Sequence, residues 1–160
     1  MAWTTPRDWT DGELVTEALL DTHVRDNLKA LTEWTTYTPT WTATGGTPTI
    51  GNGTLTGAYI QAGDLCHFWF RFVMGSTTSV GTTTGWTFGL PVAVAGGAAL
   101  VFPVLALDSG TALYHGMTTV LGGGSTFAPV GNASGFGWGY NSPFTFVTND
   151  TLTASGTYEC

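Results

Sequence analysis

The stretch from Asp64 to Met74, DLCHFWFRFVM, constrains the fold more than any other part of the chain. With the two-residue period of a β-strand, it places a wholly apolar set on one face: Cys66, Phe68, Phe70, Phe72 and Met74. With the 3.6-residue period of a helix, the aromatic side chains would spread around the whole cylinder. Burial of each ring contributes roughly 1.5–3 kcal/mol. The pattern therefore predicts a central strand that packs against a second sheet.

The rest of the chain also favours strands and turns. A chain of 160 residues is the length of one domain, and this one contains 23 glycines and only 9% charged residues. Such a composition suits strands and turns better than helices. Turn signals such as Asn52-Gly53 and Asp108-Ser109-Gly110 separate short alternating segments. We predict a mainly β, jelly-roll-like antiparallel β-sandwich, preceded by an N-terminal extended arm and one α-helix.

Charged residues are concentrated at the N-terminal end. Residues 1–34 contain three of the four basic residues and seven of the eleven acidic ones. This asymmetry predicts a boundary near Trp34, between an N-terminal arm and helix (1–34) and a β-sandwich head domain (35–160). The net charge of −7 argues against a nucleic-acid partner, because few cations are present to neutralise phosphates.

One uncharged run, Leu90–Leu107, has the length of a membrane span. It contains Pro91, Pro103 and the pair Gly96-Gly97, and several β-branched residues. These features favour two buried strands joined at the glycine pair, and we predict no membrane association.

Motifs for catalysis or metal binding are absent from the sequence. His67, His115 and the few carboxylates of the β region show no metal-site spacing, no nucleophile elbow and no phosphate-binding loop. The two cysteines, Cys66 and Cys160, are too few for a disulfide framework, and Cys66 is expected to be a small buried apolar side chain. We predict a protein that is not an enzyme and has no cofactor, no metal and no catalytic residue.

A helix is predicted from about Glu17 to Glu33. Thr16 is a suitable N-cap, and Glu17 places negative charge in the first turn. Five residues from Leu20 to Trp34 follow one another at spacings of 4, 3, 4 and 3, which is typical of a short coiled coil. The contacts between the helices of neighbouring copies would be Leu20, Val24, Asn27, Leu31 and Trp34. The alternative is an amphipathic helix packed on its own β domain, with Leu19 and Leu28 widening the stripe. The sequence leaves both open.

Two N-terminal segments carry a family resemblance. WTDGELVT (Trp9–Thr16), followed by LLDTHVRDNLKAL (Leu19–Leu31), resembles the start of many tailed-bacteriophage structural proteins. In those proteins, a W-x-x-G-E-x-V-T segment leads into a helix containing R-D-N-L. Asp21 departs from the asparagine expected there. The matching residues are Trp9, Gly12, Glu13, Val15, Thr16, Arg25, Asp26, Asn27 and Leu28.

The β region adds to this resemblance at its two ends. Tyr37–Phe72 is similar to the first hairpin of phage fibre-tip domains, and Asp150–Glu159 is similar to their last strand. Residues 91–142 show no such similarity.

The resemblance implies a virion structural protein, such as a minor tail protein, a head or tail fibre, or a capsid decoration protein. It implies a homotrimer on the outer surface of the capsid or tail, made in the host bacterial cytoplasm. The matching residues, together with Trp3, would anchor it to a major capsid or tail protein. We expect the arm to be disordered until it binds.

Two locations in the particle remain open. Two heptads span only about 20 Å, which is short for a host-binding shaft and favours a capsid decoration protein or head fibre. The alternative is a tail fibre or tip protein that recognises a host-surface glycan.

The segment GFGWGY, residues 135–140, alternates glycine with aromatic residues. If exposed, Phe136, Trp138 and Tyr140 would form a platform on which a sugar stacks. If buried, the rings join the core and the glycines allow close approach of a neighbouring strand. The buried arrangement is favoured because it is the commoner one.

Overall fold

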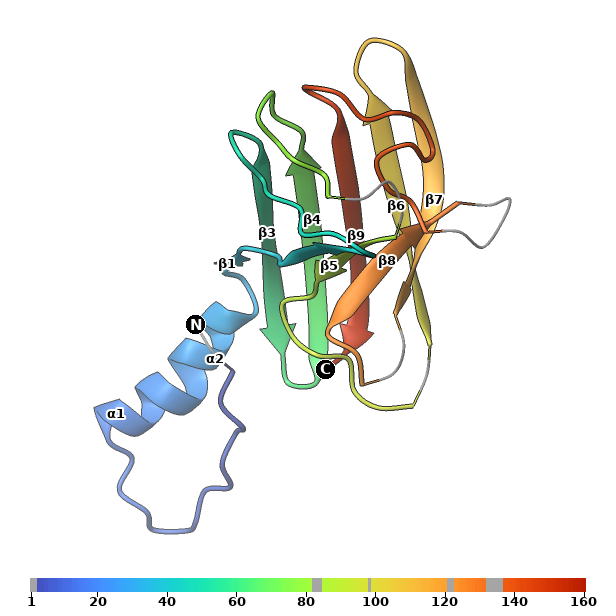
Figure 1. Cartoon of the computed structure of the whole chain (residues 1–160). Coiled ribbons are helices and arrows are strands. Elements are labelled where there is room, and N and C mark those ends of the chain that lie inside the picture. The colour runs from blue at the N-terminus through green and yellow to red at the C-terminus, as the bar shows by residue number, and fades with distance from the viewer. Residues whose placement is uncertain (1–2, 82–84, 98, 121–122, 132–136) are drawn as a thin grey trace.

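The structure, a computed structural model, describes residues 3–81, 85–97, 99–120, 123–131 and 137–160. Within these ranges it contains nine strands and one helical segment near the N-terminus (Figure 1). The helical segment comprises α1 (Glu17–Leu20), a π-helical turn η1 (Asp21–Arg25) and α2 (Asp26–Ala30). The strands are β1 (Thr35–Tyr37), β2 (Trp41–Ala43), β3 (Thr54–Ala62), β4 (Leu65–Val73), β5 (Trp86–Gly89), β6 (Leu100–Asp108), β7 (Ala112–Val120), β8 (Thr126–Val130) and β9 (Thr151–Glu159).

The strands form one curled antiparallel sheet in the order β1-β3-β4-β9-β6-β7-β8-β5-β2. The end formed by β8, β5 and β2 crosses the face of β3, β4 and β9, so that the sheet packs on itself in two layers (Figure 1). Ring contacts join the layers: the centroids of Phe70 and Phe88 are 4.6 Å apart, and those of Trp41 and Phe72 are 5.0 Å apart. The predicted fold class, a mainly β antiparallel sandwich preceded by an arm and a helix, is confirmed.

Strand β4 lies inside the sheet, between β3 and β9. Its predicted core face is buried: the side chains of Cys66, Phe68, Phe70 and Phe72 are at most 1% exposed, and Met74 is 8% exposed. Between them on the outer face, His67, Trp69 and Arg71 are exposed and Val73 is half-buried. Period-two alternation therefore identified both the strand and its buried side.

The hairpin predicted at Asp108-Ser109-Gly110 joins β6 and β7. Thr111 N donates a hydrogen bond of 2.9 Å to Asp108 O, and Gly110 has a φ of 81°, in the left-handed region that glycine favours.

The first of the two strands expected in Leu90–Leu107 does not form. Residues before Gly96 are irregular, and only β6 is a strand. Leu90 N and Val94 N, four residues apart, donate to Ser125 O and Gly124 O, whereas a ladder would use every second residue. Pro91 has no N–H to donate. Leu90 and Val94 are nevertheless buried, so hydrophobicity predicted burial here but not conformation.

The helix begins where it was predicted to and ends earlier. Thr16 Oγ1 accepts a hydrogen bond of 3.4 Å from Leu19 N, as expected for an N-cap. α2 ends at Ala30 instead of Glu33, because Thr32 and Glu33 both donate backbone hydrogen bonds to Lys29 O in a closing turn. Among the described residues, no helix is long and apolar enough to span a bilayer.

Candidate functional site

The arm is folded back along the helix, in contrast to the disordered arm that we expected. Asn27 is 5% exposed, and its side-chain amide makes two hydrogen bonds with the backbone of Thr4. Asn27 Oδ1 accepts from Thr4 N at 2.9 Å, and Asn27 Nδ2 donates to Thr4 O at 2.8 Å. A side-chain amide that hydrogen-bonds both the N–H and the C=O of one residue takes the place of the backbone of a neighbouring β-strand. Asn27 therefore fixes the arm to the helix.

A tight turn returns the chain from the arm to the helix. Gly12 has a φ of 77°, which a residue with a Cβ adopts at a cost. Glu13 Oε2 accepts hydrogen bonds from Thr10 N and Thr10 Oγ1, and Glu13 Oε1 lies 2.6 Å from Arg7 Nη2. The Arg7 guanidinium lies 5.1 Å from the centroid of the Trp9 ring. Residues of the W-x-x-G-E segment thus build this turn.

Arg25 forms two ion pairs on the surface of the helix. Its guanidinium contacts the carboxylates of Asp21, at 2.5 Å, and Asp26, at 2.9 Å. The hydrogen bond to Asp26 is the main reason that the pKa of Arg25 is raised. Asp26 and Arg25 therefore satisfy each other at the surface.

Apolar side chains of the arm and helix face solvent. Of the fourteen large hydrophobic residues that are exposed in the described part of the chain, eight lie within residues 3–34. Leu20, Val24, Leu31 and Trp34, four of the five coiled-coil positions, are each 45–47% exposed. The others are Trp9, Leu14, Val15 and Leu28. We call these eight residues the N-terminal apolar surface.

The arm and helix touch the β region at few points. The Trp34 and His67 rings lie 5.5 Å apart, and Trp3 faces Gly63 in the turn between β3 and β4. A groove lined by Trp3, Pro6, His23, Val24, Asn27, Leu28 and Leu31 separates the arm from the helix. The arm therefore covers part of the apolar stripe of the helix, and the exposed part of each stripe side chain faces solvent.

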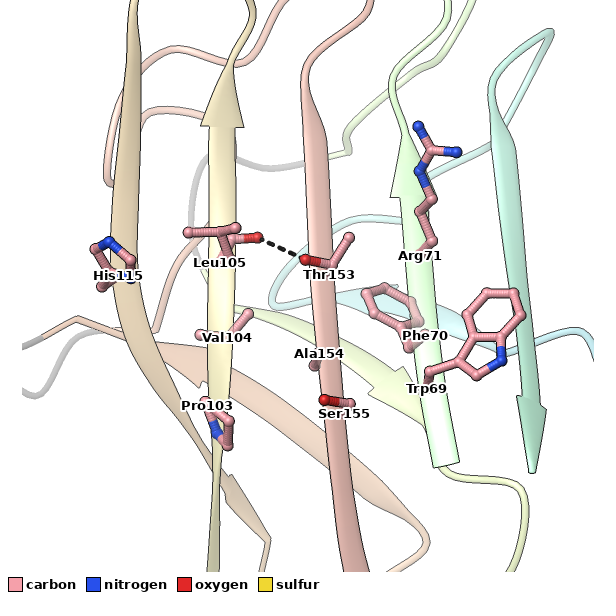
Figure 2. Close-up of a pocket in the computed structure, with 10 residues that line it drawn as sticks. All are labelled: Trp69, Phe70, Arg71, Pro103, Val104, Leu105, His115, Thr153, Ala154 and Ser155. Carbon is pink, nitrogen blue, oxygen red and sulfur yellow. Dashed lines mark hydrogen bonds between the residues drawn. The ribbon is translucent and has the colours of Figure 1, made fainter. Parts of the chain in front are cut away.

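A second candidate site is a shallow depression of about 400 Å³ on the outer face of the sheet (Figure 2). It arises because β9 presents small side chains, Thr153 and Ser155, between longer ones on β4 and β6. Trp69 and Arg71 form one wall (Figure 2). Pro103, Leu105 and His115 form the opposite side. We call this depression the outer groove.

Arg71 is the described arginine without an ion pair, since Arg7 and Arg25 are both paired with carboxylates. It projects from the outer face beside Trp69, which is 38% exposed (Figure 2). The unpaired Arg71 guanidinium, the exposed Trp69 indole and the hydroxyl groups of Thr153 and Ser155 all line the outer groove. Such a set of groups is suited to binding an anionic sugar or a similar ligand. The groove depends on the pairing of β4, β9 and β6, so no local sequence pattern indicates it.

The glycine-aromatic segment contributes to the core at its centre. Trp138 is 2% exposed, and its ring lies against the bare backbones of Gly116 and Gly131. Tyr140 is half-buried and packs against the core. Phe136 lies outside the described residues. The structure therefore places Trp138 where stacking on a sugar is not available to it.

No group of three or more His, Cys, Asp or Glu side chains in the described ranges is arranged to hold a metal ion. Burial raises the pKa of the Cys66 thiol to about 11 and also raises the pKa values of Tyr37 and Tyr158.

Fold and sites together define a β-sandwich protein with a folded N-terminal arm-and-helix unit and two uncovered surfaces. Comparison of the chain with protein-family models, with curated proteins and with solved structures finds no match.

Proposed function

We propose that this chain is a non-enzymatic structural protein of a tailed-bacteriophage virion. It forms a homotrimer and is attached to the particle through its N-terminal unit, with the capsid as the favoured location. The observation that carries the proposal is the N-terminal apolar surface, in which eight large hydrophobic side chains remain exposed. Exposed apolar side chains concentrated in one segment favour a surface that another protein covers.

The helix supports assembly with other copies. About four turns of helix are marginal without tertiary or quaternary contacts. Among the described residues, α2 contacts β3 of its own sheet, and Trp34, which follows the helix, lies against His67. Closed rotational symmetry is the usual way for identical chains to cover such a stripe. The family resemblance favours three copies. Of the five stripe positions, Leu20, Val24, Leu31 and Trp34 are exposed and would provide the contacts between copies, whereas Asn27 is already bound to Thr4 of its own chain.

The arm supports attachment to a particle. Residues of the segment that resembles phage proteins build the folded turn, namely Gly12, Glu13 and Thr16. This turn presents Trp9, Leu14 and Val15, which are 42%, 81% and 49% exposed. Tryptophan is enriched in binding hot spots, so Trp9 is the candidate anchor against a major capsid or tail protein.

Assembly is tested by light scattering coupled to size exclusion. We expect a mass close to three times the 16.8 kDa of one chain. The double variant Val24→Asp with Leu31→Asp should dissociate the trimer, because it places carboxylates in the stripe. Leu113→Asp, on the outer face of β7 and 56% exposed against 45% for Val24 and Leu31, is the control. A wild-type monomer whose mass does not change with concentration would contradict trimerisation.

Attachment is tested on virions. Immunogold labelling should locate the protein on the outside of the capsid, and Trp9→Ala should reduce its occupancy on particles. A loss of roughly 2 kcal/mol of binding free energy is expected if Trp9 is a hot spot. Normal occupancy of Trp9→Ala together with Leu14→Ala would place the attachment surface in the β region.

The outer groove favours a second candidate function, recognition of a host-surface glycan. Trp69 offers a ring for stacking, Arg71 a partner for a carboxylate or phosphate, and Thr153 and Ser155 offer hydroxyl groups. Under this function, Trp69→Ala should abolish adsorption to host cells without changing the melting temperature. Leu113→Ala on the same face is the control. Unchanged adsorption of Trp69→Ala would rule out the groove as the receptor site.

A further inference from the structure

The two cysteines of the chain, far apart in sequence, are brought side by side by the pairing of β4 with β9. Cys66 lies directly opposite Tyr158. Cys160 follows two residues later, and its N–H donates a hydrogen bond of 2.8 Å to Asp64 O, which continues the ladder. Because side chains alternate between faces, Cys66, Tyr158 and Cys160 all point toward the core. Cys160 is therefore the diagonal neighbour of Cys66.

Both thiols sit in the same apolar corner of the sandwich. Cys66 is fully buried, and Cys160 is half-buried against the same core cluster. The two thiols are near enough for each to influence the pKa of the other, and the Tyr158 hydroxyl group likewise influences the pKa of Cys66. Tyr158 is itself held by a hydrogen bond of 2.8 Å from its hydroxyl group to Val92 O. Both cysteines are free thiols in the structure.

We propose that Cys66 and Cys160 form an intrachain disulfide when the protein meets an oxidising medium. Each thiol loses its proton, one S–S bond forms, and the two electrons pass to an oxidant. With a small-molecule disulfide such as oxidised glutathione, a mixed disulfide forms first and the second cysteine displaces the carrier thiol. Two molecules of the reduced carrier leave, so atoms and electrons balance.

The backbone geometry allows the bond after a small movement. Diagonal neighbours in an antiparallel sheet have Cα atoms about 7–8 Å apart, and a disulfide needs about 4.4–6.8 Å. At this typical spacing, Cys160 would have to approach β4 by about 1 Å. Cys160 lies just beyond the last residue of β9. In the described part of the chain, its main chain is held by the backbone hydrogen bond to Asp64 O.

The cross-link would join the end of β9 to the start of β4, its neighbour in the sheet. It closes most of the β region into one covalent loop, and loops of this length reduce the conformational entropy of the unfolded chain substantially. Burial raises the pKa of both thiols, so little thiolate is present at neutral pH and oxidation should be slow there. The rate should increase as pH rises toward 9.

The test uses the full-length protein, purified with a reductant and then incubated with oxidised glutathione at pH 8.5. We expect titration of thiols after denaturation to fall from two per chain to none, and the intact mass to fall by two hydrogen atoms. The melting temperature should rise by about 5–15 °C and return to its starting value after reduction. Peptide mapping should show Cys66 joined to Cys160 of the same chain.

Cys160→Ser is the control variant, because Cys160 is half-buried and serine is of similar size. It should retain one thiol and show no increase in melting temperature under the same treatment. The inference is overturned if the folded wild-type protein retains both thiols, or takes up glutathione without closing the bond. It is also overturned if the cross-link forms only between chains. None of these results depends on whether the protein belongs to a virion.

Discussion

The carboxylate of Asp150, which is fully buried, accepts a hydrogen bond of 2.8 Å at Oδ1 from the backbone N–H of Ser109. Its Oδ2 accepts a second hydrogen bond, of 2.6 Å, from Val147 N. The backbone of Asp150 also accepts from Met74 N at 2.9 Å. One residue therefore joins the end of β4, the β6–β7 turn and the segment leading into β9.

Replacement of Asp150 tests this junction. Asp150→Ala leaves the N–H groups of Ser109 and Val147 without their acceptors, and each loss costs about 1–3 kcal/mol. We expect the free energy of unfolding, measured by urea denaturation, to fall by about 3 kcal/mol. Asp150→Asn should lose less, since its one oxygen still accepts. Asp108→Asn, in the turn that Asp150 supports, should change stability by less than about 0.5 kcal/mol. Equal stability of Asp150→Ala and wild type would show that the junction contributes nothing.

Gly156 of β9 tests the packing against core side chains of the neighbouring strand β6. A Cβ at this position would overlap the ring of Phe102, so Gly156→Ala should destabilise the protein by about 1–3 kcal/mol. Gly96→Ala is the matched control, because a Cβ there meets nothing within 4 Å. It should be neutral or stabilise by up to about 1 kcal/mol, through lower entropy of the unfolded chain. Thermal denaturation should thus show a lowered melting temperature for Gly156→Ala but not for Gly96→Ala, and similar melting temperatures would contradict this view of the core.

Trp138 tests the assignment of the glycine-aromatic segment to the core. Trp138→Ala should lower the free energy of unfolding by about 3–5 kcal/mol, because the ring is buried against Gly116 and Gly131. Trp69→Ala, in the outer groove, should cost less than about 1 kcal/mol. Both are measured by denaturant unfolding monitored by circular dichroism. If Trp138→Ala unfolds at the wild-type urea concentration, the ring is not part of the core, and the exposed platform becomes the better interpretation.

Alkaline pH should destabilise the reduced protein. Burial raises the pKa of Cys66 from 9.0 to about 11, so the folded chain holds a proton that the unfolded chain releases. This contribution to stability is complete below pH 9 and is lost as pH rises through about 11. The raised pKa values of Tyr37 and Tyr158 act in the same direction.

The measurement is the urea midpoint at pH 8, 9, 10 and 11 with a reductant present. Cys66→Ala should reduce the slope between pH 9 and 11, whatever its effect at pH 8. A midpoint that stays constant over this range would contradict the burial of these groups.

Local patterns predicted the parts of this fold that depend on neighbours in sequence. The alternation in β4, the turn at Asp108 and the cap at Thr16 were all recognisable, because each is a property of a few consecutive residues. Prediction failed between Leu90 and Gly96, where apolar residues are buried without forming a strand. Hydrophobicity there reports burial, whereas the hydrogen bonds depend on Gly124 and Ser125, which lie elsewhere in the sequence.

The sequence by itself determined that the chain is mainly β, which face of β4 is buried and where the helix begins. Only the tertiary structure decided that Asn27 binds Thr4, that Arg71 and Trp69 border a groove, and that Cys66 lies beside Cys160. Each of these relationships depends on the register between segments distant in sequence. A shift of one residue in the pairing of β4 with β9 would turn Cys160 to the opposite face, and no local pattern encodes that register.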